Sequence, residues 1–520
     1  MLIKVRSVAN VGLESVGVTV EVDVAEAGFP GFTIVGLANK AVEEARERVK
    51  TAIHNSGMDF PPKKITVNLA PADLPKEGGA YDLPIAVGIL AASGQISPQA
   101  PGLSGQLFYG ELGLDGATRA TKGVLLVGLF AKKSQVYVPI ESANEAAVVE
   151  GIEVYPVRNL KELVDHLNGV KEITKLNSLP IDQLIEDVIP DFDLADVAGQ
   201  EQAKRALTIA AAGGHNLVMW GPPGTGKTML ARAMPGILPQ LSGAEALEVT
   251  RIYSVAGMLS AGESIIRRRP FRAPHHGISA AGMVGGGSNP LPGEVSLAHL
   301  GVLFLDEMAE FPRGVLESLR QPMEDGLVGI VRAAAHVTYP AGFSLVAAVN
   351  PCPCGYLGHP RRECKCTDLQ IRKYRGRMSG PILDRIDLHV QVPAVEIEKL
   401  TADNTPSDPP LNLRGGRKGE LLTSREIREK VIQARKIQDE RFRKSGIYTN
   451  SQMKNKHVKQ FCKLDPEVSR ILRLAVEKFD LSARAYYRMI KVARTIADLE
   501  GSAEIATIHM AEALQYRQVG

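Results

Sequence analysis

The chain of 520 residues is 44% apolar and 23% charged, which describes a globular protein with several buried cores and excludes a low-complexity one. Its 61 Lys and Arg residues against 58 Asp and Glu give a net charge of +3, which excludes a histone-like or polyanionic composition but allows local basic surfaces. Aromatic residues make up only 5%, so contacts with nucleic acid are expected to involve phosphates more than stacked bases.

No leader and no membrane span are predicted. The first residues contain no continuous apolar stretch. The longest apolar run, residues 83–92, is well short of the roughly 20 residues that a membrane helix needs. We therefore expect a cytoplasmic protein with no membrane partner.

Residues 1–170 have the pattern of an α/β domain. Alternating β-branched residues predict strands over 17–25 and 63–70, and helical spacing predicts a helix over 41–57 that ends in a glycine. Two more strand-like runs follow, with a helical run between them. The pattern weakens over residues 171–190, which we interpret as a linker.

A second α/β unit is predicted over residues 191–395. Residues 396–423 are rich in Pro, Gly, Asn and Asp and predict another linker. Residues 424–520 have helical periodicity almost throughout and predict an all-α unit.

A glycine-rich segment follows an apolar strand in the second unit. A helical run comes next, which completes the strand–loop–helix context that the G-x4-G-K-[ST] motif requires. In this motif backbone N–H groups surround the β-phosphate of ATP, Lys227 reaches the β- and γ-phosphates, and Thr228 is a ligand of Mg²⁺. The predicted ATP-binding residues are Gly221, Pro222, Pro223, Gly224, Thr225, Gly226, Lys227 and Thr228.

Two adjacent carboxylates end a buried-strand pattern about eighty residues downstream, at Asp306 and Glu307. A strand-end Asp-Glu pair alone is more often a solvated turn. Because the chain also contains the glycine-rich motif, we expect Asp306 to hold Mg²⁺ and Glu307 to polarise the attacking water.

Three further polar residues are candidates for catalysis. Asn350 ends another predicted strand, where its amide either orients the lytic water or is an ordinary strand terminus. Arg385 lies between two Asp residues, so it forms a local ion pair or reaches a neighbouring site as an arginine finger. Arg484 is predicted in the first turn of a helix capped by Ser482, a position that calls for an anionic partner such as the γ-phosphate.

With these residues in place, the chain resembles the AAA+ ATPases, and among them the magnesium-chelatase-like proteins of the ComM/YifB family. The resemblance covers nearly the whole chain and rests on long, specific strings at residues 271–307, 350–359, 377–390 and 481–500. It implies an α/β fold class with a Lon-protease-like N-terminal domain, a P-loop AAA+ core with a helix-2 insert and a pre-sensor-1 hairpin, and an all-α lid.

The resemblance also implies roles and partners. Asn350 matches sensor 1, Arg385 the arginine finger and Arg484 the sensor 2 arginine, while residues 271–297 match the insert and 326–343 the hairpin. It further implies a hexameric ring that hydrolyses ATP to move on single-stranded and branched DNA. Within the family the implied role is helicase-driven branch migration during integration of transforming DNA.

The Lon-like resemblance does not extend to peptidase chemistry. The nucleophilic serine of the Lon pattern would fall at Ala80, and the lysine that acts as general base would fall near Leu125. Without a hydroxyl there is nothing for a base to activate. We therefore expect a scaffold for oligomerisation or DNA guidance.

Four of the five cysteines stand close together in the sequence, at Cys352, Cys354, Cys364 and Cys366. Four thiols in one polar loop can complete a closed tetrahedral Zn²⁺ site, and the alternative is unligated thiols. We expect structural zinc here. His275 and His276 have no carboxylate or cysteine near them in the sequence, so we interpret them as ordinary polar residues.

Residues 361–377 carry seven Lys and Arg against two acids. A solvated face is the usual interpretation of such a run. In a ring ATPase, and beside a zinc loop, contact with DNA phosphates is the better one. The candidate DNA-binding residues are Arg372, Lys373 and Arg375 in this run and Arg332 in the hairpin, and Arg267 to Arg269 form a similar basic cluster.

Two alternative functions remain open. One is a magnesium-chelatase-type motor that drives metal insertion into a porphyrin. The other is an ATPase scaffold with a vestigial protease domain, since the missing serine and lysine argue against an active ATP-dependent protease.

Overall fold

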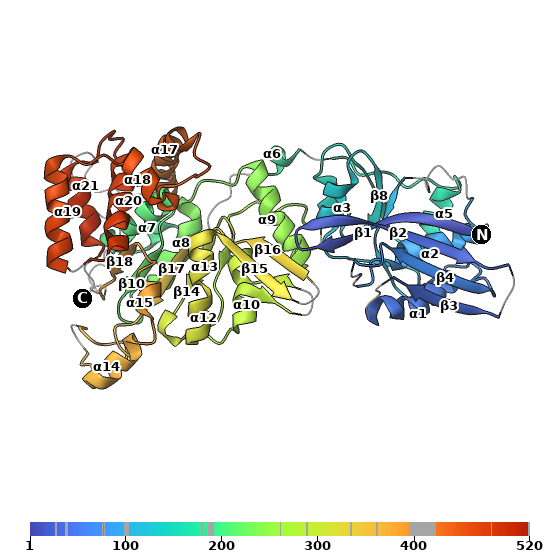
Figure 1. Ribbon diagram of the computed structural model, residues 1–520, viewed down its shortest axis with the longest axis horizontal. Coiled ribbons are helices and arrows are strands. Elements are labelled where there is room, and N and C mark those ends of the chain that lie inside the picture. Colours follow the sequence, from blue (N-terminus) through green and yellow to red (C-terminus); the bar gives the residue numbers. More distant parts are fainter. Residues whose placement is uncertain are drawn as a thin grey trace.

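The computed structural model describes residues 1–26, 29–36, 40–74, 76, 78–97, 103, 105–178, 180–185, 192–260, 262–287, 290–332, 335–359, 362–394, 423–479 and 481–517. Figure 1 shows an elongated molecule in which an N-terminal unit (1–178), a central unit (192–394) and a helical unit (423–517) follow one another along the long axis. No helix among the described residues combines the length and the apolar character that crossing a membrane requires.

The N-terminal unit is built on a seven-stranded sheet of order β3-β4-β2-β1-β5-β8-β9. Its centre is antiparallel, through β1–β2 and β2–β4, and the other four pairings are parallel. The strands are β1 (Leu2–Val11), β2 (Glu14–Val24), β3 (Gly31–Val35), β4 (Lys64–Ala70), β5 (Leu107–Phe108), β8 (Gln135–Pro139) and β9 (Glu153–Val157), with β6 (Glu111–Leu112) and β7 (Thr118–Arg119) as a separate pair.

Helices cover this sheet. Every residue of α2 is buried, because the helix is apolar apart from Asp82, which pairs with Arg48 of α1, and it packs against β1, β2 and α1. The helices are α1 (Lys40–Asn55), α2 (Asp82–Ala92), α3 (Val124–Ala131), α4 (Ala143–Ala147) and α5 (Leu160–Leu167), and the short α6 (Ile181–Leu184) lies in the predicted linker. The strands predicted over 17–25 and 63–70 and the helix predicted over 41–57 are present as β2, β4 and α1.

The turn between β1 and β2 anchors the N-terminal unit to the central unit. Gly12, at φ +60°, lies so close to Val337 that a Cβ there would be 2.5 Å from its Cγ1. Arg251 donates a hydrogen bond from Nη2 to the carbonyl of Leu13 at 2.6 Å. The long hairpin in Figure 1 is therefore part of the contact between the two units.

The central unit contains a five-stranded parallel sheet of order β11-β14-β17-β10-β18. Its strands are β10 (Leu217–Trp220), β11 (Phe271–Arg272), β14 (Val302–Leu305), β17 (Ser344–Val349) and β18 (Leu388–Gln391). All four residues of β10 and of β14 are buried, as expected of strands covered on both faces. The carboxyl ends of parallel strands meet at one edge, where such sheets bind ligands.

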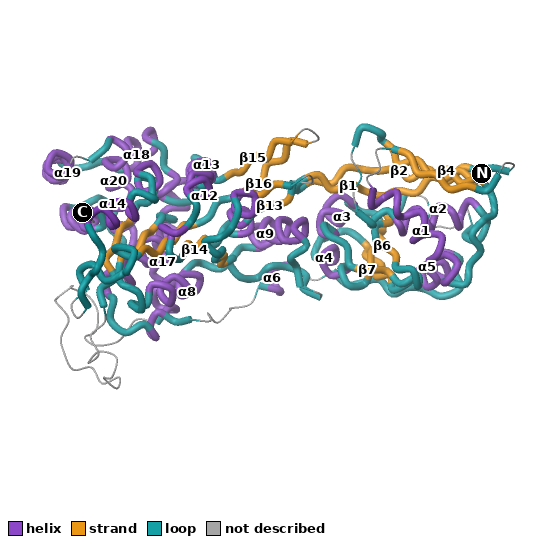
Figure 2. The backbone as a smooth tube through the Cα atoms, turned by 90° about the horizontal axis from the view of Figure 1, so that it is seen from below, coloured by secondary structure: helices purple, strands orange, loops and turns teal. Residues whose placement is uncertain are grey.

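The remaining elements of the central unit surround this sheet. The helices are η1 (Leu194–Asp196), α7 (Glu201–Gly213), α8 (Lys227–Ile237), α9 (Gly243–Ala256), α10 (Ala280–Val284), α11 (Glu294–Leu297), η2 (Met308–Glu310), α12 (Arg313–Ser318), α13 (Arg320–Asp325), α14 (Asp368–Arg375) and α15 (Gly380–Leu383). Two small antiparallel pairs are β12 (Gly285–Gly286) with β13 (Leu291–Pro292), and β15 (Leu327–Arg332) with β16 (Ala335–Pro340). Figures 1 and 2 place the β15–β16 hairpin on the side of the central unit that faces the N-terminal unit.

The helical unit packs on the central unit and shares a hydrophobic core with it. Its helices are α17 (Ser424–Phe442), η3 (Asn450–Gln452), α18 (Asn455–Phe461), α19 (Pro466–Phe479), α20 (Ala483–Leu499) and α21 (Thr507–Gln515). Arg435 and Gln438 of α17 donate hydrogen bonds to the carbonyls of Ala211 and Ala212 at the end of α7. The predicted linker 396–423 lies, except for its last residue, outside the described residues.

Candidate functional site

The glycine-rich loop follows β10 and leads into α8. Gly224 and Gly226 adopt φ angles of +78° and +86°, which favour glycine. Gly221 has no room for a side chain, because a Cβ there would be 2.1 Å from the carbonyl oxygen of Val392. The loop therefore needs glycine at these three positions.

Lys227 is nearly buried at the start of α8. Its Nζ donates hydrogen bonds to the carbonyls of Gly221 and Pro222, both at 2.7 Å, and to Oδ1 of Asn350 at 3.3 Å. Burial lowers the pKa of Lys227 to about 8, against the opposing effect of the Asp306 and Glu307 carboxylates. Phosphate oxygens can replace the two carbonyls as acceptors, and their charge would favour the protonated lysine.

Thr228 and Asp306 meet beside the loop. The Thr228 hydroxyl donates to Oδ2 of Asp306 at 3.0 Å, and Oδ1 of Asp306 accepts from the backbone N–H of Glu307 at 3.0 Å. Mg²⁺ takes oxygen ligands, and a hydroxyl and a carboxylate this close can share one ion. The residues present therefore fit Mg²⁺.

Glu307 follows β14 at φ +51°, which is uncommon for a residue other than glycine. Its side chain is 53% exposed, and Oε2 lies 3.9 Å from Nδ1 of His276. The His276 ring lies next to that of His275, with centroids 4.0 Å apart and planes tilted by 34°. The sequence interpretation of His276 as an ordinary polar residue missed this position beside Glu307, because no local pattern links the two.

Arg385 and Arg484 lie together at a third residue, Glu324 of α13. Oε1 of Glu324 is 2.8 Å from Nη2 of Arg385 and 3.3 Å from Nη2 of Arg484. Nε of Arg385 is buried without a hydrogen-bond partner among the described residues. In the described part of the chain, neither arginine forms a hydrogen bond or ion pair with the glycine-rich loop.

The two Asp residues that flank Arg385 have other partners. Asp384 pairs with Arg517 at 2.9 Å. Asp387 lies 3.1 Å from Nδ1 of His215 and 3.5 Å from Nε of Arg488. Although burial raises it, Arg488 and His215 hold the pKa of Asp387 well below its usual range. The local ion pair of Arg385 is therefore with Glu324 and not with its sequence neighbours.

As predicted, Ser482 caps α20 by accepting a hydrogen bond from the N–H of Ala485.

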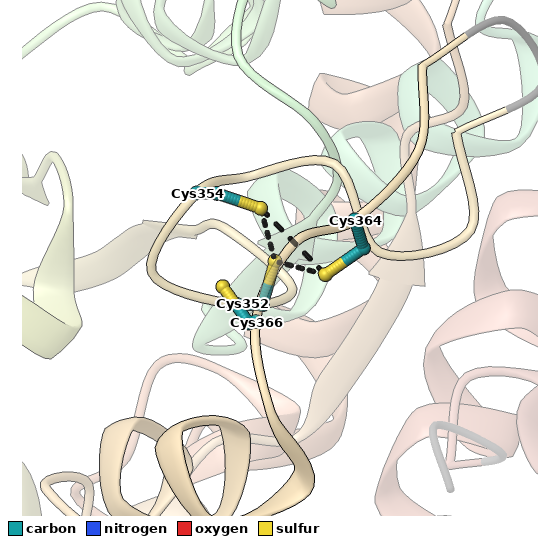
Figure 3. Close-up of side chains that lie close together, drawn as sticks. All are labelled: Cys352, Cys354, Cys364 and Cys366. Atoms are coloured by element: carbon teal, nitrogen blue, oxygen red, sulfur yellow. Dashed lines mark hydrogen bonds between the residues drawn. The ribbon is translucent and has the colours of Figure 1, made fainter.

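The four cysteines point toward one another in Figure 3. The Sγ atom of Cys352 lies 3.4 Å from that of Cys354 and 3.6 Å from that of Cys364, and all four sulfurs lie within 4.8 Å of one another. Sulfurs that share a tetrahedral Zn²⁺ with bonds of about 2.3 Å are separated by about 3.8 Å. The geometry therefore fits one zinc ion.

The cysteine loop also contacts the glycine-rich loop. Cys352 follows Asn350 by two residues, and Gly355, at φ +81°, lies against the ring of Pro223. A Cβ on Gly355 would be 2.7 Å from Cδ of Pro223. No feature of the sequence predicted this contact.

The basic residues of α14 are exposed in its last turn, at Arg372, Lys373 and Arg375. Thr367 caps the helix by accepting a hydrogen bond from Gln370 N–H, and Tyr374 is buried beneath it. In Figure 1 α14 projects from the central unit. Arg332 is the last residue of β15, and its side chain lies outside the described part of the structure.

In the N-terminal unit the two positions of the absent dyad are apolar and buried. Ala80 is 6% exposed, and Leu125 is fully buried in α3. Neither position offers a nucleophile or a base.

Three family models match the chain, one in each of its three units. Residues 193–400 match the family model "Magnesium chelatase, subunit ChlI", residues 20–142 match "Subunit ChlI of Mg-chelatase" and residues 422–517 match "Magnesium chelatase, subunit ChlI C-terminal".

Two similar proteins match nearly the whole chain, and a third matches only a part of it. Competence protein ComM of Haemophilus influenzae is 46% identical over 99% of this chain and 97% of its own length. The protein YifB of Escherichia coli is 43% identical over the same shares. An archaeal Lon protease of Halobacterium salinarum is 39% identical over 22% of this chain and 16% of its own length, so that similarity is local. The chain belongs to the ComM/YifB family of magnesium-chelatase-like AAA+ ATPases.

Proposed function

We propose that the protein is an ATP-driven DNA motor, a hexameric ring whose helicase activity promotes branch migration during homologous integration of DNA in natural transformation. The observation that carries this proposal is the meeting of Arg385 and Arg484 at Glu324, without a contact to the chain's own glycine-rich loop. Two arginines in this position are suited to the phosphates of a neighbouring chain, so that ATP hydrolysis would require a ring. The name of the relative from Haemophilus influenzae supports the setting in competence.

Each residue of the ATP site has a role in this proposal. Thr228 and Asp306 would hold Mg²⁺, which would supply positive charge to the phosphates. Lys227 exchanges its carbonyl acceptors for β- and γ-phosphate oxygens. Glu307 polarises the attacking water, and Asn350, which accepts a hydrogen bond from Lys227, orients that water at the γ-phosphate.

The arginines complete the site from the neighbouring chain. Arg385 is the proposed finger that stabilises charge on the transferred phosphate, and Arg484 is the proposed second sensor of the γ-phosphate. Nε of Arg385 is a buried donor without a partner in the described residues, which supports a role in binding an anion.

DNA phosphates are the proposed ligands of Arg372, Lys373 and Arg375, which are exposed on one short helix. Arg332, at the end of β15, is proposed to contact DNA from the hairpin. We propose that the four cysteines hold a structural Zn²⁺, which fixes the loop that leads to α14.

A magnesium-chelatase-type motor is the second candidate, because all three family models carry that description. It would use the same ATP site and the same shared arginines, but its ATPase would not respond to DNA. An ATPase scaffold with a vestigial protease domain is the third, and it is supported by the apolar residues at Ala80 and Leu125.

The test is a DNA-stimulated ATPase and branch-migration assay on the wild type and on Glu307→Gln. DNA is expected to raise the turnover of the wild type and to be moved at a four-way junction. Glu307→Gln is expected to bind ATP and to lose turnover by at least a hundredfold. Glu477→Gln, a change of an exposed glutamate on α19, is the matched control and should behave as wild type.

The motor hypothesis fails if single-stranded, double-stranded and branched DNA all leave ATP turnover unchanged at every salt concentration and no junction is processed. Turnover that DNA leaves unchanged but a porphyrin-binding partner protein stimulates would favour the chelatase-type motor. The single tryptophan, Trp220, directly precedes Gly221, so its fluorescence can follow ATP binding without a label.

A further inference from the structure

A hollow of about 690 Å³ lies in the central unit away from the glycine-rich loop. Its walls include the last turn of α8 and the start of β11, and none of residues 221–228 lines it. Along α8 the lining begins at Arg232, five residues and about 7.5 Å of helix axis beyond Lys227. The hollow is therefore separate from the ATP site described above.

Arginines dominate the charge of this hollow. Five line it, and Glu263 is the one carboxylate among the described lining residues; the arginines are Arg232, Arg267, Arg268, Arg269 and Arg428. Glu263 is partly engaged, since its Oε2 accepts a hydrogen bond from the N–H of Ser260 at 3.3 Å. A recess that gathers one sign of charge concentrates positive potential within it.

The five arginines are not equivalent. Arg269 is held in the fold, because it donates to the carbonyl of Leu300 at 2.8 Å and pairs with Glu245 at 3.3 Å. The sequence grouped it with Arg267 as a DNA contact, but these bonds engage its guanidinium within the fold.

Arg232 and Arg267 are exposed, and within the described residues neither forms a hydrogen bond or an ion pair. Arg232 has one aromatic neighbour, with its guanidinium 5.4 Å from the ring centre of Phe192. Two guanidinium groups that border one recess without a polar partner are ready to bind an anion. Arginine forks match the oxygens of phosphate.

Flat apolar surface accompanies these charges. The rings of Phe192, Tyr253 and Phe271 also line the hollow. Rings beside guanidinium groups suit a ligand that has both a planar base and a phosphate chain. The volume lies in the range of about 300–1,000 Å³ that small-molecule sites occupy, and a recess suits a free nucleotide better than a rod-like duplex.

We propose that this hollow is a second nucleotide site, in which Arg232 and Arg267 bind the phosphate chain and the aromatic rings contact the base. The site joins the central and helical units, since Phe192 opens the central unit, Arg232 belongs to its helix α8, and Arg428 belongs to α17 of the helical unit. A bound nucleotide would therefore link the helical unit to the central one.

The test is isothermal titration of ADP into the full-length chain carrying Lys227→Ala, which disables the glycine-rich loop. One ADP per chain is expected to bind. Adding Arg232→Ala and Arg267→Ala should weaken that binding at least tenfold. Adding Arg470→Ala and Arg473→Ala, two exposed arginines on α19, should change it less than twofold. Pyrophosphate should bind at least tenfold more weakly than ADP.

Several results would overturn the proposal. The first is that the Lys227→Ala chain does not bind ADP. The second is that ADP affinity falls equally in the Arg232/Arg267 variant and in the Arg470/Arg473 variant. The third is that pyrophosphate binds as tightly as ADP. A 20-base-pair duplex that displaces ADP from the hollow would assign the recess to DNA. A change in Trp220 fluorescence with the same midpoint as the heat signal would assign the ADP to the glycine-rich loop. None of these outcomes depends on whether the protein moves DNA.

Discussion

The imidazole of His276 lies 3.9 Å from the carboxylate of Glu307, from Nδ1 to Oε2. Glu307 is the proposed base of the ATP site, and His276 belongs to the segment that follows β11 and leads to α10. The carboxylate is half exposed, so a neighbour that holds its direction matters for the placement of the water. His276 is in the right place to be such a positioning residue.

His276→Ala is therefore expected to lower the kcat of ATP hydrolysis about tenfold and to leave KM for ATP within twofold. His276→Asn, which keeps a polar donor, should recover part of the loss. Steady-state kinetics of the DNA-stimulated reaction measure both. His54→Ala, at the exposed end of α1, is the control. A loss that appears in KM alone would show that His276 acts on binding and not on Glu307.

Glu324→Gln tests the shared contact of Arg385 and Arg484. The carboxylate is the counter-ion of both guanidinium groups, so without its charge they repel each other and lose their common position. Turnover of the assembled ring should fall about tenfold, while ATP binding followed by Trp220 fluorescence stays unchanged.

The matched control for Glu324 is Glu317→Gln on the preceding helix, where the carboxylate pairs with Arg320 at 2.6 Å. Equal turnover in the two variants would contradict a special role for Glu324.

The sequence could predict those parts of the site that consist of consecutive residues. The glycine-rich loop and Asp306–Glu307 each follow a buried strand of a parallel sheet, and parallel strands bring such ends to one edge. The grouping of the four cysteines was predictable for a similar reason, because one short loop contains them all. In each case the local pattern determined the position.

Contacts between distant segments could not be predicted in this way. Glu324 meets Arg385 and Arg484 only because α13, the turn after α15 and the start of α20 converge, and no periodicity indicates which segments will meet. His276 and Glu307 follow neighbouring strands, β11 and β14, but the order of the strands had to be known first. The arginine hollow likewise combines segments whose charges look like solvated surface when read singly.

Glu145 makes the contact between the N-terminal and central units dependent on pH. Burial raises its pKa to about 7, although the Ser254 hydroxyl, which donates at 2.6 Å, and the Leu125 N–H both lower it. Between the ordinary pKa of 4.5 and about 7 the folded chain keeps a proton that the unfolded chain has lost. The unfolded state then binds fewer protons, so the free energy of unfolding falls as the pH rises through this window.

Glu145→Gln removes that dependence. Relative to wild type it should raise the free energy of unfolding by about 1–3 kcal/mol at pH 8 and change it little at pH 4.5. Denaturant unfolding at the two pH values is the measurement. Glu150→Gln, an exposed glutamate nearby, should show no such difference between them. An equal effect of Glu145→Gln at both pH values would show that its carboxyl does not titrate in this range.

Metal analysis tests the four-cysteine site. Protein purified without chelator is expected to carry about one Zn²⁺ per chain, and Cys354→Ser or a strong chelator should remove it. Cys462→Ser should keep the metal, because Cys462 is buried elsewhere and its Sγ lies 3.9 Å from Sδ of Met453. Less than half an equivalent of zinc in the wild type would contradict the assignment.

Gly355→Ala tests whether the cysteine loop supports the ATP site. The new Cβ would lie 2.7 Å from Cδ of Pro223, so either the cysteine loop or the glycine-rich loop must move. Gly358 is the matched control in the same loop, because it has a similar φ of +78° and nothing within 4 Å of its Cβ position. Backbone strain is then common to both variants, and only Gly355→Ala adds the contact.

ATP affinity, followed by Trp220 fluorescence, should fall about fivefold to tenfold in Gly355→Ala and less than twofold in Gly358→Ala. Zinc content should stay near that of the wild type in both, which would separate the effect on Pro223 from loss of the metal. If both variants bind ATP equally, the packing of Gly355 on Pro223 does not support the nucleotide site. If Gly355→Ala loses zinc as well, the contact acts through the shape of the cysteine loop and not directly on the glycine-rich loop.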